Sequence, residues 1–461
     1  MMPIWQNFHP AMATVDLSPI LRAPKSQAPG RQTCQTGLRE VWRSRCCGPD
    51  VVACLLPVAA LPRARRGARR NHRATARQAR DTSRAQLLRA ATLPSMASEV
   101  CWAAGAVAPD LRGRFAVVTG ANRGIGKGVA LGLGEAKATV FVTGRNRTGL
   151  ESTAELVTRA GGQGVPILCD HSDDTQVARA FEEIGKQTGG KLDILVNNAF
   201  KSPASSDPKV DQQLSKGAKF YELPLSVWDD VQTVGLKSHY VASYYAAPML
   251  LAAREANPTR RPLLCAVSSF GGVTYLFATA YGVGKAATDR LIRDLQVELG
   301  PLGVDCVSLW PGIVLTEEVQ RKIREDPAML EEVAGGQDLE SAAESPLLTG
   351  RVVAQLAAEE KYRKPPYVTA PGLTGRLCIV AETAHDLQLR DGGMEGSVAR
   401  EVYGPDRSPA PSIRSLGFLG PGALKASLPE SLRFLAEKGG PLANEEVRLP
   451  LEFMAQGPPK N

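Results

Sequence analysis

Short apolar runs alternate with longer amphipathic stretches between residue 114 and about residue 380 of this chain. The runs are rich in Val, Ile and Leu, as in strands buried on both faces, and the stretches between them repeat their apolar positions with helical spacing. Strands are expected at 114–119, 138–143, 165–169, 192–196, 263–267, 304–310 and 376–380, and helices at 124–137, 148–161, 173–188, 226–256 and 279–300. This alternation predicts the α/β class, with a Rossmann-type doubly wound parallel sheet of about seven strands and helices on both faces.

The alternation stops short of both ends of the chain. We therefore expect a leader at 1–109, one folded domain at 110–400 and a C-terminal extension at 401–461. Residues 1–95 contain 16 Lys and Arg against four Asp and Glu, a charge of +12, whereas the remaining residues carry −4. An Arg-rich, acid-poor leader is typical of a presequence for a plastid or mitochondrion. The alternatives are a disordered basic arm or untranslated sequence upstream of Met96, with a cytoplasmic or endoplasmic-reticulum location.

Composition also excludes several classes of protein. The basic charge belongs to the leader, and no aromatic residues interleave with its Arg-rich run at 63–89, so we do not expect a nucleic-acid partner. The apolar run Val51–Leu61 is interrupted by Pro57 and is too short for a transmembrane segment. The nine cysteines form no C-x-x-C pair, which favours a reduced compartment with most thiols in the core. His171 and His239 lack partners at metal-ligand spacing, so no metal site is expected.

A glycine-rich turn follows the first predicted strand. Its spacing is G-x-x-x-G-x-G, with Gly120 permitting a tight turn, Gly124 letting the backbone approach a pyrophosphate, and Gly126 allowing close helix–strand packing. The pyrophosphate would meet the free N–H groups of the helix that follows. The other residues of the turn that we expect to bind a dinucleotide are Asn122, Arg123 and Ile125. A purely structural turn is the alternative, which the position between the first strand and first helix disfavours.

Two arginines indicate which dinucleotide binds. Arg145 stands at the end of the second strand, where an acidic residue would bond a ribose 2′-hydroxyl, and Arg123 lies in the glycine turn. Because guanidinium groups pair well with phosphate, the two together favour NADP(H) over NAD(H).

Serine, tyrosine and lysine side chains lie beyond the fifth strand. The strand 263–267 ends in Ser268 and Ser269, and Tyr281 and Lys285 share one face of the next helix at i and i+4. A phenol beside an ammonium is favoured in its ionised form, and a nearby serine could hold a carbonyl oxygen ready for its proton. The group is therefore a candidate general-acid site. In isolation, a half-buried core tyrosine and a surface lysine would be the simpler interpretation.

These features together resemble the short-chain dehydrogenase/reductase (SDR) superfamily. The resemblance combines the glycine turn, Asn197-Asn198-Ala199, the serine followed by Tyr281 and Lys285, and Pro311-Gly312-x-x-x-Thr316. The similar stretches, from residue 113 to about 400, point to the subgroup called dehydrogenase/reductase family member 1.

The resemblance implies a role for each matching residue. Tyr281 would donate the proton, Lys285 would hold the nicotinamide ribose and lower the pKa of Tyr281, and Ser269 would orient the carbonyl, with Ser268 as the alternative. The other positions expected to contact the cofactor are Asp170 and Asn198 with Ala199 at the adenosine end, and Pro311, Gly312, Ile313 and Thr316 at the nicotinamide end. The resemblance also implies a homo-oligomer built on the helices 226–256 and 279–300.

Two positions depart from the pattern that the resemblance implies. Thr233 stands where we match the family's helix asparagine, and Phe200 follows Ala199 in place of the usual glycine. The long, irregular segments 201–225 and 317–345, the second of which opens with a charged helical pattern at 317–332, should form the walls and lid of the substrate pocket. We expect an NADPH-dependent carbonyl reductase or alcohol dehydrogenase acting on a small molecule. A 3-ketoacyl-thioester reductase and a non-catalytic dinucleotide-binding protein are the alternatives.

Overall fold

The computed structural model describes residues 101–103, 106–203, 207–325, 343–369 and 376–410. The leader before residue 101, the lid beyond residue 325 and the extension beyond residue 410 lie outside these ranges. The presequence and its target compartment therefore stay predictions, and so do the two domain boundaries near residues 110 and 400.

Seven parallel strands form the central sheet in the order β5-β4-β3-β6-β7-β8-β9. Their bounds are β3 (Phe115–Val118), β4 (Thr139–Gly144), β5 (Gln163–Leu168), β6 (Ile194–Asn197), β7 (Leu263–Val267), β8 (Asp305–Trp310) and β9 (Leu377–Ile379). A short antiparallel pair, β1 (Cys101–Ala103) and β2 (Ala106–Val107), precedes the sheet. The chain reverses its direction of travel across the sheet between β3 and β6, and in such sheets a ligand binds at the carboxyl ends of these strands. The predicted doubly wound class is confirmed.

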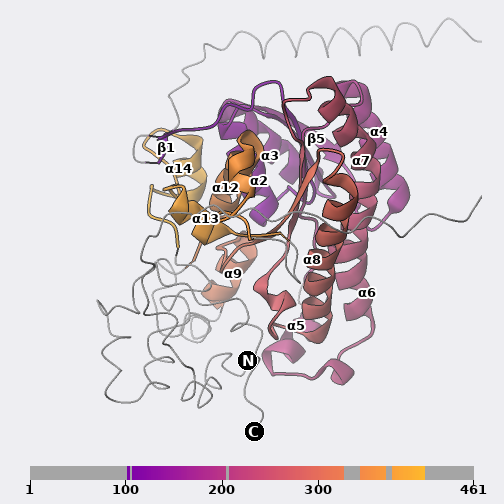
Figure 1. The fold of residues 1–461 in the computed structure, drawn as a ribbon. Coiled ribbons are helices and arrows are strands. Elements are labelled where there is room, and N and C mark those ends of the chain that lie inside the picture. The colour runs from indigo at the N-terminus through magenta and orange to yellow at the C-terminus, as the bar shows by residue number, and fades with distance from the viewer. Residues whose placement is uncertain (1–100, 104–105, 204–206, 326–342, 370–375, 411–461) are drawn as a thin grey trace, which may run out of the picture. The chain divides into compact units, whose positions relative to one another are not determined.

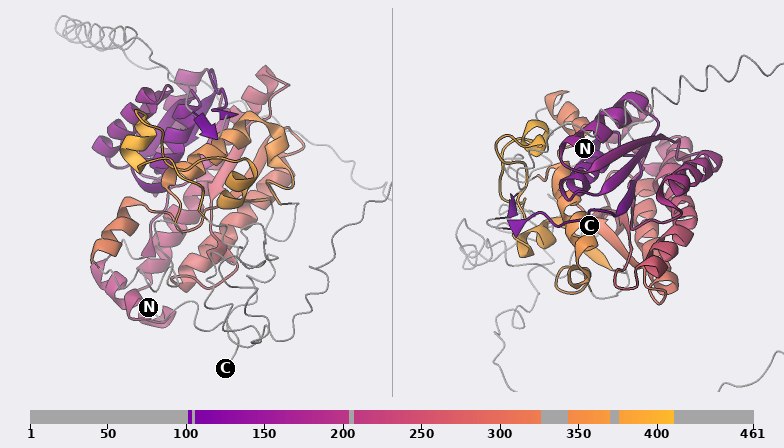
Figure 2. Two further views of the ribbon diagram at one scale, coloured as in Figure 1. Left: turned by 90° about the vertical axis from the view of Figure 1, so that its left-hand side faces the viewer. Right: turned by 90° about the horizontal axis from the view of Figure 1, so that it is seen from above.

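Helices cover both faces of the sheet, as the views in Figures 1 and 2 show. One face carries α2 (Gly124–Glu135), α3 (Arg147–Arg159) and α12 (Pro346–Ala358), and the other carries α4 (Asp174–Thr188), α7 (Ser238–Ala256) and α8 (Thr279–Leu299). Strand residues alternate between the two cores, with Ala116 and Val118 in one and Val117 in the other. Because both faces are covered, the strands are apolar throughout, which is the pattern that predicted them.

Glycines let α2 and α12 pack unusually close together. A Cβ added at Gly128 would lie 2.1 Å from the carbonyl carbon of Pro346, and one at Gly132 would lie 2.5 Å from that of Gly350. Because the backbones of α2 and α12 are in contact, α12 fixes the position of α2. Helix α2 begins at the end of the glycine turn. The position of the turn is thus set by a helix more than 200 residues away in sequence.

The structure corrects two sequence predictions. The helix expected at 226–256 is divided into α6 (Ser226–Gln232), a π-helical segment η4 (Thr233–Lys237) and α7. The segment 201–225, expected to be irregular, contains α5 (Pro208–Ser215) and the 3₁₀ turn η3 (Phe220–Glu222). Asp207 caps α5 by accepting from the Lys209 N–H, and Pro208 opens the helix. An Asp-Pro pair is a sequence signal for a helix start, so this helix could have been foreseen.

Several shorter elements complete the described fold. They are η5 (Phe270–Gly272), α9 (Glu317–Glu325), η6 (Glu360–Arg363), α13 (Val380–Asp386) and α14 (Val398–Tyr403). Helix α9 starts at the predicted residue, Glu317, and its expected continuation to residue 332 lies outside the described ranges. Among the helices that the structure describes, none has the length and hydropathy needed to cross a membrane. Cys169, Cys265, Cys306 and Cys378 are free and buried, as predicted for core thiols.

Candidate active site

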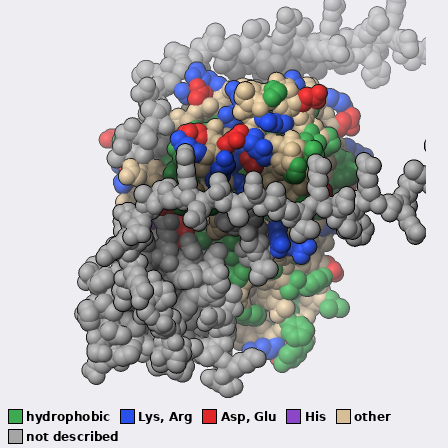
Figure 3. Space-filling view, in the orientation of Figure 1, with side chains coloured by type: hydrophobic (Ala, Val, Ile, Leu, Met, Phe, Trp, Pro, Cys, Tyr) green, Lys and Arg blue, Asp and Glu red, His purple; other side chains and the backbone are tan. Residues whose placement is uncertain are grey.

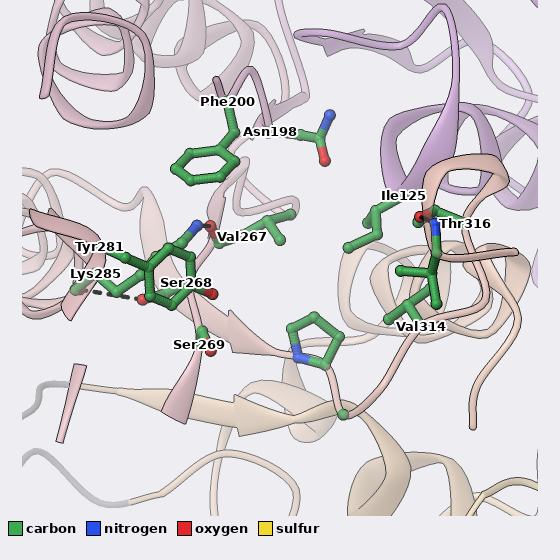
Figure 4. A pocket seen from close by; sticks show the side chains of 13 residues that line it. Ile125, Asn198, Phe200, Val267, Ser268, Ser269, Tyr281, Lys285, Val314 and Thr316 are labelled. Carbon is green, nitrogen blue, oxygen red and sulfur yellow. Dashed lines mark hydrogen bonds between the residues drawn. The ribbon is translucent and has the colours of Figure 1, made fainter. Parts of the chain in front are cut away.

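A pocket lies at the carboxyl ends of the central strands, and Ser269, Tyr281 and Lys285 all line it. Figure 4 shows these three with Ser268 on one side of the pocket and Ile125, Val314 and Thr316 on the other. Strand β7 delivers the two serines, and α8 presents Tyr281 and Lys285 one turn apart. The structure thus brings together the residues that the sequence predicted as a general-acid site.

The two serines have different partners. The Ser269 side chain interacts with the Tyr281 phenol and acts to lower its pKa, and the Ser269 Oγ accepts from the Gly271 N–H at 3.1 Å. Ser268 turns toward α8, where its Oγ donates to the backbone carbonyl of Lys285 at 3.1 Å. The hydroxyl that lies beside the phenol is therefore that of Ser269.

Burial has the largest effect on the pKa of Tyr281. It raises the pKa of the phenol to about 12, although the hydrogen bond from Ser269 opposes the rise and Asp289 adds to it. This is opposite to the direction that the resemblance implied. The reason is that Lys285 Nζ lies 5.8 Å from the centroid of the Tyr281 ring, too far to compensate for the loss of water around the phenol.

Lys285 is an almost fully buried cation, with 6% of its surface exposed. Its Nζ donates to the Val267 carbonyl at 3.0 Å and lies 4.6 Å from the centroid of the Phe200 ring. Burial lowers the pKa of Lys285 to about 8, and the negative charge of Asp289 opposes that shift.

Asp289 is a buried carboxyl group that the sequence reasoning did not single out. It accepts from Ser308 Oγ at 2.5 Å and from Trp310 Nε1 at 3.1 and 3.2 Å. Burial raises the pKa of Asp289 to about 6, while these hydrogen bonds and one from Ser268 oppose the rise. The sequence signal was its place four residues after Lys285, on the same helical face.

The glycine turn after β3 has the backbone conformation that its spacing predicts. Gly120 has φ +65°, and a Cβ there would lie 2.8 Å from Ala199 Cα. Gly126 lies against Asn198, whose Nδ2 donates to the carbonyls of Thr119 and Gly120 at 2.8 and 3.1 Å. Asn198 and Ala199 thus brace the turn. Thr119, which the sequence reasoning missed, completes the brace because its Oγ1 accepts from both of their N–H groups.

The start of α2 already attracts an anion. Gly124 has φ +58°, and its N–H donates to Glu317 Oε2 of α9 at 2.8 Å, while Lys127 Nζ lies 3.7 Å from Glu317 Oε1. Free amides at a helix N-terminus favour negative charge. A glycine without a side chain, an amide that already binds a carboxylate and a nearby ammonium fit the diphosphate of a dinucleotide, with Ile125 and Thr316 lining the adjoining pocket.

The residues predicted at the adenosine end gather beyond this turn. Arg145 Nη1 lies 3.8 Å from Asp170 Oδ2, and Arg123 Nη1 lies 3.8 Å from Glu318 Oε2. Both arginine side chains are more than half exposed, at 66% and 58%. Burial would raise the pKa of Asp170, but hydrogen bonds from Ser172 and the charge of Arg145 outweigh it and hold the pKa below its usual range. Asn122 packs on the same side, with its Oδ1 3.0 Å from a Cβ built at Gly144.

The loop after β8 forms the opposite wall of the pocket. Pro311, Gly312 and Thr316 line it, as predicted, but Val314 takes the place expected for Ile313. The Ile313 side chain instead packs with Ala343 and other apolar residues beneath the loop. Alternation along an extended segment turns neighbouring side chains in opposite directions, so only one of the two can face the pocket.

The histidines have structural partners. His171 Nε2 is hydrogen-bonded to Thr143 Oγ1 at 2.7 Å, and His239 Nε2 to the Ala199 carbonyl at 3.1 Å. Within the described residues, no three His, Cys, Asp or Glu side chains are grouped as metal ligands.

A parallel sheet whose strand order reverses, together with a glycine turn and a buried Ser–Tyr–Lys group, is characteristic of a class of dinucleotide-dependent oxidoreductases. The family model described as short chain dehydrogenase matches residues 114–328. Dehydrogenase/reductase SDR family member 1 of Mus musculus is 36% identical over 315 residues, which cover 68% of this chain and 93% of that protein. Its Homo sapiens counterpart is 38% identical over 287 residues, or 62% of this chain and 85% of that protein.

A more distant relative is named for a specific activity. The rhamnolipids biosynthesis 3-oxoacyl-(acyl-carrier-protein) reductase of Pseudomonas aeruginosa is 33% identical over 227 residues, which cover 48% of this chain and 80% of that protein. The chain belongs to the short-chain dehydrogenase/reductase family, close to dehydrogenase/reductase SDR family member 1. It is accordingly an NAD(P)-dependent oxidoreductase of hydroxyl and carbonyl groups, which confirms the class predicted from the sequence.

Proposed function

We propose that this protein is an NADPH-dependent carbonyl reductase, able to run in reverse as an alcohol dehydrogenase, with Tyr281 as its general acid. The observation that carries the proposal is that Ser269, Tyr281 and Lys285 line one pocket at the carboxyl ends of the strands. When bound, the reduced nicotinamide supplies a hydride to the carbonyl carbon. Tyr281 donates its proton to the carbonyl oxygen, and Ser269 holds that oxygen in place.

Lys285 has two tasks in this proposal. Its ammonium bonds the ribose next to the nicotinamide, and its positive charge stabilises the tyrosinate that remains after proton transfer. The high pKa of Tyr281 keeps the phenol protonated at neutral pH, as a proton donor requires.

The preference for NADP(H) is supported by Arg123 and Arg145. Their guanidinium groups are more than half exposed and, among the described residues, form long ion pairs at 3.8 Å, so both can turn toward a 2′-phosphate. Asp170 is already paired with Arg145, which neutralises the nearby carboxylate.

A 3-ketoacyl-thioester reductase is the second candidate. The observation that favours it is the 33% identity with the Pseudomonas aeruginosa reductase, which acts on a 3-oxoacyl chain. Hydrophobic side chains gather at the end of the molecule where α5 lies (Figure 3), and Phe220, Tyr221 and Leu225 next to α5 are each more than 65% exposed. An exposed apolar surface of this kind suits an acyl chain.

The test is oxidation of NADPH by the full-length protein over a panel of ketones, aldehydes and 3-ketoacyl thioesters, with NADH for comparison. We expect turnover with NADPH that falls at least about a hundredfold in Tyr281→Phe, because the general acid is lost. Tyr362→Phe is the matched control, since it removes a phenol from a residue of η6 that does not line the pocket.

Two outcomes would contradict the proposal. Binding of NADPH without turnover on any carbonyl would favour the non-catalytic alternative. Equal rates with NADH and NADPH would contradict the proposed cofactor preference but not the proposed reaction class.

We also propose a homo-oligomer that uses the outer surfaces of α7 and α8. Support comes from Tyr240 and Tyr244 on α7 and Val297 on α8, which are 56%, 65% and 70% exposed. Large apolar side chains grouped on one surface are typical of subunit interfaces.

A further inference from the structure

The Phe200 ring packs against the ammonium of Lys285. Phe200 follows Ala199 after β6 and lines the pocket, and Figure 4 shows its ring beside the Lys285 and Tyr281 side chains. The Phe200 ring centroid is 4.6 Å from Lys285 Nζ and 5.8 Å from the Tyr281 centroid, with the two rings nearly perpendicular at 80°. One aromatic ring therefore contacts both the ammonium and the phenol.

The contact between the Phe200 ring and the Lys285 ammonium is a stabilising cation–π contact. An ammonium over an aromatic face is attracted by the ring, and the attraction grows when water is excluded. Lys285 Nζ has three donors, one of which is bonded to the Val267 carbonyl. The ring face offers a second contact to an ammonium that is largely removed from solvent, since only 6% of the Lys285 surface is exposed.

Gly235 makes this ring position possible. A Cβ built at Gly235 would lie 2.8 Å from Phe200 Cδ2 and 3.0 Å from Cε2, closer than a side chain allows. Gly235 is the buried residue at the centre of the π-helical segment η4, two residues after Thr233. The Phe200 ring occupies the space that a side chain at position 235 would need, although 35 positions separate the two residues in the chain.

We propose that Phe200 is a positioning residue whose ring face holds the Lys285 ammonium in the pocket, with Gly235 leaving the room that the ring needs. The inference rests on the proposed function, in which Lys285 binds the nicotinamide ribose and supports Tyr281. Phe200 keeps Lys285 charged and directed toward the pocket when water is excluded.

The charge of Lys285 can be followed separately from that of its neighbours. The titratable groups facing it are Tyr281 and Asp289 on α8 and His239 on α7. Burial lowers the pKa of His239 to about 3 and raises those of Asp289 and Tyr281 to about 6 and about 12. With a pKa of about 8, Lys285 is thus the group of this cluster that changes charge between pH 7 and pH 10.

The experiment measures the dissociation constant of NADP⁺ from pH 7 to pH 10, which needs no substrate. In the wild type, affinity should weaken as pH rises through the pKa of Lys285. In Phe200→Leu we expect the inflection to move down by about one pH unit, because the charged form loses its aromatic contact. Phe200→Tyr keeps the ring face and should restore the wild-type inflection.

Phe277→Leu is the matched control for loss of a ring. Phe277 also meets Tyr281 edge-on, with centroids 5.1 Å apart at 86°, but it is 53% exposed. Its removal should leave the inflection in place. If Phe200→Leu fails to fold by circular dichroism, Gly235→Ala takes its place, since the added methyl displaces the ring without removing it.

The outcomes separate the two proposals. No binding of NADP⁺ or NAD⁺ by the wild type would overturn the proposed function. Wild-type binding with an inflection that neither Phe200→Leu nor Gly235→Ala moves would overturn only the role of Phe200, as would an affinity that does not change from pH 7 to pH 10.

Discussion

Glu344 is a buried carboxyl group that connects the pocket wall to the rest of the domain. Its Oε1 accepts from the Gly312 N–H at 2.9 Å, and its Oε2 has no hydrogen-bond partner in the described part of the chain. Burial raises the pKa of Glu344 to about 8, reinforced by Asp391, although the Gly312 hydrogen bond and Arg407 oppose the rise. A group with a pKa raised on folding binds its proton more tightly in the native state.

This shift predicts how stability depends on pH. The native state loses stability through Glu344 as pH rises from about 4.5, the usual value, to about 8. Glutamine cannot ionise, so Glu344→Gln should leave the melting temperature at pH 5 little changed and raise it at pH 9 by roughly 2–4 °C relative to wild type. Differential scanning fluorimetry at the two pH values measures this.

Glu359→Gln is the control, because Glu359 forms a surface pair with Lys361 at 2.6 Å. Exposed pairs contribute little, so this variant should follow the wild type at both pH values. A Glu344→Gln protein that is destabilised equally at pH 5 and pH 9 would show that the carboxyl acts through packing alone.

At the scale of elements, the pair α2 and α12 determines where the glycine turn lies. Gly132 and Gly350 let the two backbones touch, and the buried Arg351 Nε bonds Glu135 Oε2 at 2.9 Å across the same interface. A residue with a side chain at this contact must push the helices apart. The dinucleotide turn would move with α2, because the helix begins within the turn.

Gly132→Ala tests this packing. A Cβ at 132 would lie 2.5 Å from the Gly350 carbonyl carbon and 2.8 Å from Arg351 N, so we expect a loss of about 1–3 kcal/mol in the free energy of unfolding. Gly185→Ala in α4 is the control: nothing lies within 4 Å of its Cβ, and helix propensity should stabilise it by roughly 0.5–1 kcal/mol. Urea unfolding measures both, and equal stability of Gly132→Ala and wild type would refute the close contact.

For the whole molecule, the exposed face of α7 predicts self-association. Tyr240 and Tyr244 are one helical turn apart, and side chains at i and i+4 lie on the same face of a helix. The double change Tyr240→Glu and Tyr244→Glu places two charges on this face. We expect it to convert an oligomer into a monomer of 49.2 kDa, which light scattering after size-exclusion chromatography would detect.

Tyr221→Glu is the control, since this tyrosine is 72% exposed but lies in η3, away from α7. It should keep the wild-type mass. A wild-type protein that already runs as a monomer would refute the proposed assembly without affecting the proposed reaction.

Much of the fold and the site follows from local pattern. Strand β7 has the bounds that its apolar run predicts, and α4, α8 and α9 begin at or within one residue of their predicted starts. The glycine turn is also local, because only glycine adopts the positive φ of positions 120 and 124 without strain. Tyr281 and Lys285 share a face because the helical repeat places them there.

The sequence by itself therefore determined the order of elements, the dinucleotide turn and the family of the chain. Only the tertiary structure decided which distant residues meet: Phe200 with Gly235, Gly132 with Gly350, and Glu317 with the first amide of α2. It also decided the acidity of Tyr281, whose pKa rises where the adjacent lysine alone predicted a fall. The physical reason is that spacing along a chain encodes local geometry, whereas burial and desolvation depend on what all the other elements place around a side chain.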